Sequence, residues 1–303
     1  MPNLSRVLAG LLLPASLFLG SIACAPLATP IVSAPPAPPS APAPEPIAPE
    51  PVTSPVTTEI VPAVAEIPRE RVRPVVLVYH MLNGLDDEMA VEPAVFAQQM
   101  QWLADHQITV VRTSDLVAFL DGRRTLPERT AVIQLDDGHA SVYSKAYPIL
   151  ARHGFPFTLA LTTQPLESAH PNVVSWAAVR EMLSSGLCEL ASHSHIHGHM
   201  DRLTEERNHT EVLLSRSIIE ARTGVRPEAF VFPFGENSAR VRAVVESAGY
   251  RAAFAVGGVP ARAESPRYQI PRVSVLRSIK TLARFFREPA GVAGATAGAP
   301  KRG

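Results

Sequence analysis

Residues 131–150 decide the fold, and they read AVIQLDDGHASVYSKAYPIL. Residues 131–135 form an apolar run of strand length, and apolar residues recur at helical spacing across 142–150. Between the two stands Asp-Asp-Gly, residues 136–138. Asp-Gly by itself is typical of a hairpin turn, but here a helical pattern follows the turn in place of a second strand. The two carboxylates are therefore expected in a loop that leads from a strand into a helix.

The same alternation of short apolar runs and amphipathic stretches extends on both sides of this segment. We expect strands at residues 75–79, 108–111, 131–135, 157–161, 188–191, 229–232, 251–256 and 269–275. Helices are expected between them, with Ser114, Ser175 and Thr204 as N-caps. Seven or eight strand–helix units that close on themselves predict an α/β fold, a distorted (β/α)7-type barrel in a single catalytic domain. In such a barrel the reactive residues lie at the C-terminal ends of the strands.

The composition excludes several classes of protein. The 303 residues include 28 Lys+Arg and 28 Asp+Glu, so the formal net charge is 0, and 46% of the residues are apolar. A nucleic-acid-binding protein needs a basic surplus to neutralise phosphates, so we expect no nucleic-acid partner. The apolar content fits neither a wholly disordered chain nor a polytopic membrane protein. A catalytic domain at 74–288 is long enough to bury a core of its own.

The segments outside this domain predict export and a tether. Residues 1–24 combine a basic start with an apolar run and are interpreted as a signal peptide. Cys24 resembles the lipidated cysteine of a bacterial lipoprotein, while cleavage by ordinary signal peptidase and a plain membrane anchor are the alternatives. Residues 25–73 are rich in proline and are expected to form a disordered linker, and 289–303 a disordered tail. The expected location is periplasmic or outer-membrane-anchored, with membrane contact only through a lipid on Cys24.

A histidine cluster follows the strand at 188–191. His193 and His197 are four residues apart, the spacing that places two imidazoles on one face of a helical turn. Two imidazoles and one carboxylate leave positions open for water and substrate, which is typical of a catalytic metal. His195 and His199 are expected to be non-ligands, although an extended segment would place all four on one face. A His-rich surface loop is the alternative interpretation.

These motifs resemble the NodB-homology polysaccharide deacetylases, carbohydrate esterase family 4. The first family motif is an aromatic residue followed by Asp-Asp-Gly, and residues 135–138 match it with Leu135 in the aromatic place. His-Ser/Thr-x-x-His is matched by residues 193–197, and Pro-Tyr-Gly by Pro-Phe-Gly at 233–235. The resemblance extends from Pro74 to about Phe286 and implies a barrel that removes acetyl groups from glycans.

The resemblance also implies roles for individual residues. Asp137, His193 and His197 would bind a divalent metal, for which zinc is expected and nickel or cobalt are alternatives. Asp136 would be the general base. Residues 233–235 (Pro233, Phe234 and Gly235) would contact the substrate.

Two family features are missing. Val231 stands where an arginine usually precedes Pro-Tyr-Gly, and no later Leu-x-His motif supplies a general acid. Both gaps resemble the branch that deacetylates poly-N-acetylglucosamine, in which a Tyr-His pair opens the domain, here Tyr79-His80. His80 is then the expected acid, and Arg272 could replace the missing arginine. Trp176 is expected either to stack on a sugar ring or to pack in the core.

The expected function is therefore metal-dependent hydrolysis of N-acetyl groups, which gives acetate and free amines. The expected partner is an N-acetylated polysaccharide, either an exopolysaccharide or peptidoglycan. An O-acetyl esterase on the same scaffold and an inactive carbohydrate-binding homologue are the alternatives. The sequence leaves the polysaccharide, the metal and the oligomeric state open.

Overall fold

The computed structural model describes residues 67–83, 88–274 and 278–286. The predicted signal peptide at 1–24, Cys24, the tail at 289–303 and most of the predicted linker lie outside the described residues. Residues 67–73, the end of that predicted linker, pack against the domain. Val72 is buried, and the guanidinium of Arg69 donates hydrogen bonds to the carbonyl groups of Phe119 and Leu120.

Strands and helices alternate along the described chain. The strands are β1 (Val75–Tyr79), β2 (Thr109–Val110), β3 (Thr130–Leu135), β4 (Phe157–Leu161), β5 (Cys188–Ser192), β6 (Ala229–Val231), β7 (Ala252–Val256) and β8 (Ile270–Ser274). The helices are α1 (Pro93–Asp105), α2 (Thr113–Leu120), α3 (Tyr147–His153), α4 (Thr163–Glu167), α5 (Trp176–Ser184), α6 (Glu205–Thr223), α7 (Ala239–Ser247) and α8 (Ile279–Arg284). A π-helical turn, Val142–Ala146, precedes α3.

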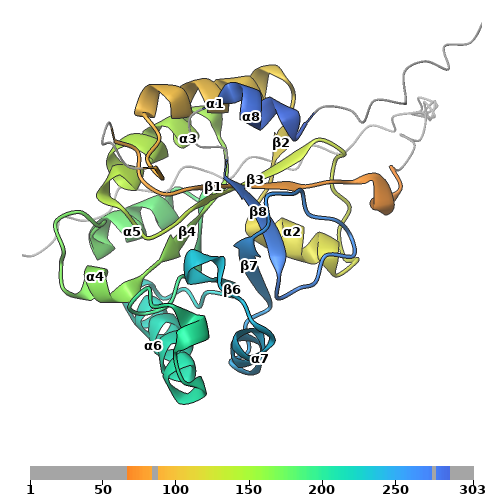
Figure 1. Cartoon of the computed structure of the whole chain (residues 1–303). Coiled ribbons are helices and arrows are strands. Elements are labelled where there is room, and N and C mark those ends of the chain that lie inside the picture. Colours follow the sequence, from red (N-terminus) through yellow and green to blue (C-terminus); the bar gives the residue numbers. More distant parts are fainter. Residues whose placement is uncertain (1–66, 84–87, 275–277, 287–303) are drawn as a thin grey trace, which may run out of the picture. The chain divides into compact units, whose positions relative to one another are not determined.

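The strands close into a parallel barrel that the helices surround (Figure 1). β3 to β8 follow one another in chain order, β8 pairs with β1, and β1 pairs with β3 along its whole length. This ring has seven strands, and the short β2 pairs only with the start of β3. The predicted (β/α)7-type barrel is confirmed.

Side chains alternate between the inside and the outside of the barrel. Val76, Val132, Ala191, Val231 and Phe254 belong to one buried apolar cluster, as expected for interior positions of successive strands. The intervening residues face the helices: a second cluster joins β1, β3 and β4 to α1, α3 and α5, and a third joins β6 and β7 to α7. The same alternation continues into the residue directly after a strand, so the alternation also determines whether that residue points into the barrel.

Most predicted elements are found where the pattern placed them. The predicted N-caps Ser175 and Thr204 accept hydrogen bonds from the backbone three residues on. The prediction for Ser114 is wrong: α2 begins at Thr113 with Arg112 as N-cap, and the Ser114 hydroxyl contacts Glu189 instead. The sequence analysis also missed the short helix α4. None of the helices in the described residues is long and apolar enough to cross a membrane.

Candidate metal centre and active site

Three of the predicted site residues lie at the C-terminal ends of barrel strands. His80, Asp136 and His193 are each the first residue after a strand, β1, β3 and β5. The backbone N–H of Asp136 still donates to Tyr79, at 2.9 Å, so Asp136 continues the ladder and points into the barrel. Asp137 then leaves the ladder with a φ of 67°.

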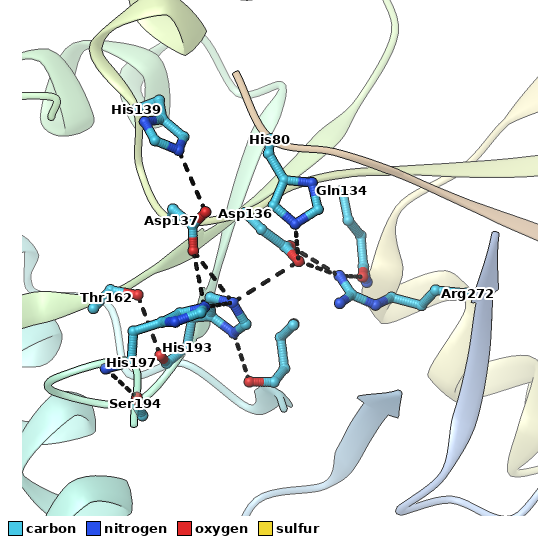
Figure 2. A network of polar contacts seen from close by, with 11 residues as sticks. His80, Gln134, Asp136, Asp137, His139, Thr162, His193, Ser194, His197 and Arg272 are labelled. Carbon is cyan, nitrogen blue, oxygen red and sulfur yellow. Dashed lines mark hydrogen bonds and ion pairs between the residues drawn. The ribbon is translucent and has the colours of Figure 1, made fainter. Parts of the chain in front are cut away.

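Left-handed backbone conformations gather at this site. Six non-glycine residues in the described chain have positive φ, and Asp137, Ser194, His197 and Phe234 are four of them. Such conformations cost free energy for residues with a Cβ, and they persist where the surrounding structure enforces them. They turn the Asp137 and His197 side chains toward one another across the barrel mouth (Figure 2).

Three ligand atoms converge on one point. The Oδ1 atom of Asp137 lies 3.4 Å from Nε2 of His193 and 3.3 Å from Nε2 of His197, and the two Nε2 atoms are 3.2 Å apart. Ligand atoms about 2.0–2.1 Å from a tetrahedral zinc ion lie about 3.3–3.4 Å from one another. The spacing of these atoms therefore fits the three protein ligands of a catalytic metal.

The hydrogen bonding and charge of the triad agree with this fit. Asp137 Oδ1 is buried and has no hydrogen-bond donor in the described residues. The Nδ1 atom of His193 is 2.7 Å from the carbonyl of Val231, so Nδ1 carries the proton and Nε2 presents its lone pair. Burial lowers the pKa of His193 against the opposing effect of Asp136 and Asp137, which keeps the imidazole neutral.

His139 contacts the other oxygen of the Asp137 carboxylate. Its Nε2 atom lies 3.3 Å from Oδ2. Burial acts to raise the pKa of Asp137, but the hydrogen bond from His139 and the charge of nearby histidines outweigh it, so the pKa lies well below its ordinary value. No role was predicted for His139, although it directly follows Asp-Asp-Gly, a position that could have indicated one.

Asp136 is fully buried beside the triad and is held by Arg272. Nη1 of Arg272 donates to both carboxylate oxygens, at 2.8 and 2.7 Å. Nε2 of His80 is 3.9 Å from Asp136 Oδ2, and Nε2 of His193 is 4.0 Å from the same atom. Figure 2 shows the guanidinium on the side of Asp136 away from the two histidine ligands. Arg272 thus contacts Asp136 from β8. This is the contact expected of a residue that replaces the arginine missing at Val231.

An open cavity of about 380 Å³ borders these groups. Its lining includes His80, Asp136, Asp137, His193, His197, Phe234, Gly235 and Arg272, together with Met81, Met89 and Val256. The Phe234 ring is 55% exposed and stacks on His199, with ring centres 4.1 Å apart. Pro233 is buried.

Trp176 lies elsewhere. It is half-buried against the core that includes α5, it donates a hydrogen bond to Glu167 at 2.9 Å, and it is not among the residues that line the cavity. Of its two expected roles, this position agrees with core packing.

Glu211 of α6 fixes the loop that carries the histidines, and the sequence analysis did not identify it. Its Oε2 atom accepts the backbone N–H groups of His195 and Ile196, at 3.0 and 2.8 Å. The His195 ring points away from the triad, with Nδ1 2.8 Å from the Thr163 hydroxyl. His199 pairs with Glu236 at 2.8 Å. Neither histidine belongs to the group of converging ligand atoms.

The comparison with known families agrees with this geometry. Residues 123–253 match the family described as polysaccharide deacetylase, and the match includes Asp136, Asp137, His193 and His197. The chain carries a polysaccharide deacetylase domain. The matched segment of the deacetylase domain includes neither His80 nor Arg272, so the expected roles of these two residues depend on their geometry.

Relatives of the deacetylase domain carry a more specific name. This chain is 25% identical over 227 residues to the poly-beta-1,6-N-acetyl-D-glucosamine N-deacetylase of Escherichia coli (strain K12). The alignment covers 62% of this chain but only 34% of that protein. The enzyme of the same name from Staphylococcus aureus (strain MRSA252) is 22% identical over 202 residues, which is 61% of the chain and 68% of that protein.

The fold of the deacetylase domain is also found in solved structures. The Streptococcus pyogenes deacetylase PplD in complex with acetate superposes with a TM-score of 0.67 at 18% identity. The match covers 72% of this chain and 99% of that one. The two proteins therefore share the barrel fold. At 18% identity, this similarity is evidence for the fold alone.

Proposed function

We propose that this chain is a metal-dependent polysaccharide N-deacetylase that acts on glycans containing N-acetylglucosamine. The observation that carries the proposal is the separation of two roles between adjacent carboxylates. Oδ1 of Asp137 lies 3.4 and 3.3 Å from the Nε2 atoms of His193 and His197. Asp136 accepts hydrogen bonds from Arg272 and is farther from His193, with Oδ2 4.0 Å from Nε2, so it would not be a ligand and could exchange protons. The names of the relatives from Escherichia coli and Staphylococcus aureus support poly-N-acetylglucosamine as the substrate.

Each side chain has one task in the proposed reaction. Asp137, His193 and His197 would hold a divalent ion, with zinc favoured by the donor set. Lewis acidity is what such an ion supplies here, since it polarises a carbonyl and acidifies water. Asp136 accepts the proton of the attacking water, and Arg272 keeps that carboxylate in place. His80, with Nε2 3.9 Å from Asp136, donates a proton to the leaving nitrogen of the sugar. The products are acetate and a free amine.

The cavity and its setting support the remaining parts of the proposal. Phe234 and Gly235 line the mouth, where a sugar ring can lie against the exposed aromatic face. We also propose that the protein is exported, because residues 1–24 have the composition of a signal peptide. A lipid on Cys24 and the linker at 25–73 would let the domain reach a polymer from the membrane surface.

The test is acetate release by the purified protein with and without a chelator. The panel contains poly-β-1,6-N-acetylglucosamine, peptidoglycan and O-acetylated xylan. We expect release from an N-acetylated glycan that chelation abolishes and zinc restores. Release from the O-acetylated xylan alone would assign the esterase alternative, and no release from any glycan would contradict the proposed activity.

Asp136→Asn tests the division of labour between the two carboxylates. The amide is similar in shape but cannot accept a proton as a base, so turnover should fall by about 10²- to 10⁴-fold. Zinc content per chain should stay at the wild-type value, because Asp136 is not a ligand. In the matched variant, His193→Ala, zinc content should fall as well. Wild-type turnover of Asp136→Asn would show that Asp136 is not the base.

A further inference from the structure

Inside the barrel, next to Asp136, buried polar side chains form a hydrogen-bonded network. Val132 and Gln134 on β3, and Asp136 directly after it, are successive inward positions, and both Gln134 and Asp136 are fully buried. A primary amide in the interior of a barrel is costly unless its donors and acceptor find partners. The partners of Gln134 therefore indicate why it is there.

Gln134 joins Arg272 to the opposite end of the barrel. Its Oε1 atom accepts from Nη1 of Arg272 at 3.4 Å, and its Nε2 atom donates to the Thr113 hydroxyl at 3.1 Å. Thr158 of β4 donates to the same hydroxyl at 2.7 Å. Thr113 is the first residue of α2, and it is buried. The backbone N–H of Ser114 donates to Glu189 of β5, at 3.1 Å, which anchors the start of the helix.

The chemistry of these groups permits one orientation of the amide. A guanidinium group only donates hydrogen bonds, so the amide oxygen of Gln134 must face Arg272. The amide nitrogen then points to the other side, where the Thr113 oxygen accepts from it. Thr113, at the start of α2, thus fixes the amide of Gln134. The amide oxygen then presents a fixed acceptor to Arg272.

Among the described residues, Arg272 has few other hydrogen-bond partners that could orient it. Its side chain is 97% buried, since only 3% of it is exposed, and its Nε atom has no hydrogen-bond acceptor among the described residues. The hydrogen bonds of its side chain in the described part of the chain go to Asp136 and Gln134. Figure 2 shows the amide of Gln134 beside the guanidinium, close to Asp136.

We propose that Gln134 is a positioning residue for the reaction: it holds Arg272 so that this arginine aligns the carboxylate of Asp136 with the attacking water. This inference rests on the proposed function, because it assigns a role within the same site. Gln134 does not line the cavity and would not contact the substrate. Its effect should therefore appear in kcat and not in substrate affinity, since a misplaced base slows proton transfer without changing the binding surface.

The test replaces the amide by an apolar side chain of similar length, Gln134→Met. We expect kcat for acetate release to fall about 10- to 100-fold, the effect of a displaced catalytic group. KM and zinc content should stay within about twofold of the wild-type values, because uniform binding is untouched. Gln99→Met is the matched control: Gln99 is fully buried on α1, outside the barrel, and this change should leave kcat unaltered.

A double-mutant cycle separates positioning from a general loss of stability. If Gln134 acts through Arg272, then Gln134→Met should have no further effect on kcat once Arg272→Met is present. Effects that multiply in the double variant would overturn the proposal, as would a wild-type kcat in Gln134→Met. Should Gln134→Met fail to fold, Thr113→Val replaces it, because that change keeps the shape and removes the acceptor that fixes the amide. A wild-type kcat in Thr113→Val would then overturn the proposal.

A crystal structure of Gln134→Met tests the positioning role of Gln134 independently of enzymatic activity. If the wild-type protein releases no acetate from any glycan, the proposed function fails and the crystal structure alone decides the positioning. Displacement of the Arg272 guanidinium from Asp136 would support the role of Gln134. An Arg272 that stays within hydrogen-bond distance of both Asp136 oxygens would overturn it.

Discussion

At the scale of single residues, the two oxygens of Asp137 have separate partners. Oδ1 faces His193 and His197, and Oδ2 lies 3.3 Å from Nε2 of His139. A partner on the second oxygen keeps the carboxylate in the orientation in which one oxygen is a ligand. In the proposed metal centre, His139 would therefore support Asp137 without binding the ion.

We expect His139→Ala to weaken zinc binding about 10- to 100-fold, the usual cost of losing a group that orients a ligand. The measurement is competition for zinc against a chromogenic chelator. His209→Ala, on the outer part of α6 near Glu205, is the control and should leave the affinity unchanged. Equal affinities for the two variants would show that His139 does not support Asp137.

Gly235 is a second residue whose role can be read from its surroundings. Its φ is 73°, and a Cβ atom added to it would lie 2.7 Å from Cγ2 of Val256 and 3.0 Å from the Val256 backbone nitrogen. Gly154 has a φ of 63°, but no atom lies within 4 Å of the corresponding position. The two glycines share a conformation and differ in the space around them.

This difference predicts unequal effects of alanine. Gly154→Ala should destabilise the protein by about 1–2 kcal/mol, the cost of the left-handed conformation alone. Gly235→Ala should cost more, because backbone at the cavity wall must also move. Free energies of unfolding from urea titrations provide the comparison. A smaller loss for Gly235→Ala than for Gly154→Ala would contradict the predicted clash with β7.

At the scale of elements, α6 fixes the loop that carries His193 and His197. Glu211 is buried on this helix and accepts two consecutive backbone N–H groups, those of His195 and Ile196. The loop also places Ser194 and His197 in left-handed conformations. Glu211 offsets that strain by supplying acceptors that a tight loop cannot provide from its own backbone.

Glu211→Ala should leave both N–H groups without their acceptor. A fully buried group without a partner costs about 1–3 kcal/mol. These two hydrogen bonds are partly buried, so the free energy of unfolding should fall by about 1–3 kcal/mol in total. Zinc affinity should fall too, because His197 is no longer held. Glu206→Ala, at an exposed position of the same helix, is the control. Unchanged zinc affinity in Glu211→Ala would indicate that the loop keeps its form without α6.

At the scale of the whole domain, the proposed metal ligands come from opposite sides of β4. Asp137 follows β3 and His193 follows β5, and β4 pairs with both strands. An unfolded chain cannot keep these residues together, so an ion bound to the triad stabilises the folded state by mass action.

Zinc at about 100 times its Kd should raise the stability by about 2.7 kcal/mol, which is about 5–10 °C in Tm for a domain of this size. Thermal unfolding with added zinc and with chelator measures the shift. In His193→Ala the shift should disappear. A zinc-dependent shift of the same size in that variant would place the ion elsewhere in the chain.

The sequence by itself determined the order and the period of the elements. The strand at 157–161 was predicted at the bounds of β4, and the caps Ser175 and Thr204 were found as predicted, because these features depend on residues close together in the chain. It also placed His80, Asp136 and His193 at strand ends, since the apolar runs stop there. The family resemblance added the expected pairing of Asp137 with the histidines.

Only the tertiary structure decided which distant groups touch. Nothing in the pattern near Gln134 or Glu211 shows that Gln134 contacts Arg272 or that Glu211 contacts the loop that carries the histidines. These contacts depend on the closure of the barrel and on the packing of α6 beside it, which bring together residues up to 138 positions apart, as in Gln134 and Arg272. Local sequence determines which side of a strand a residue faces, whereas its partner across the barrel is determined by how all seven strands close.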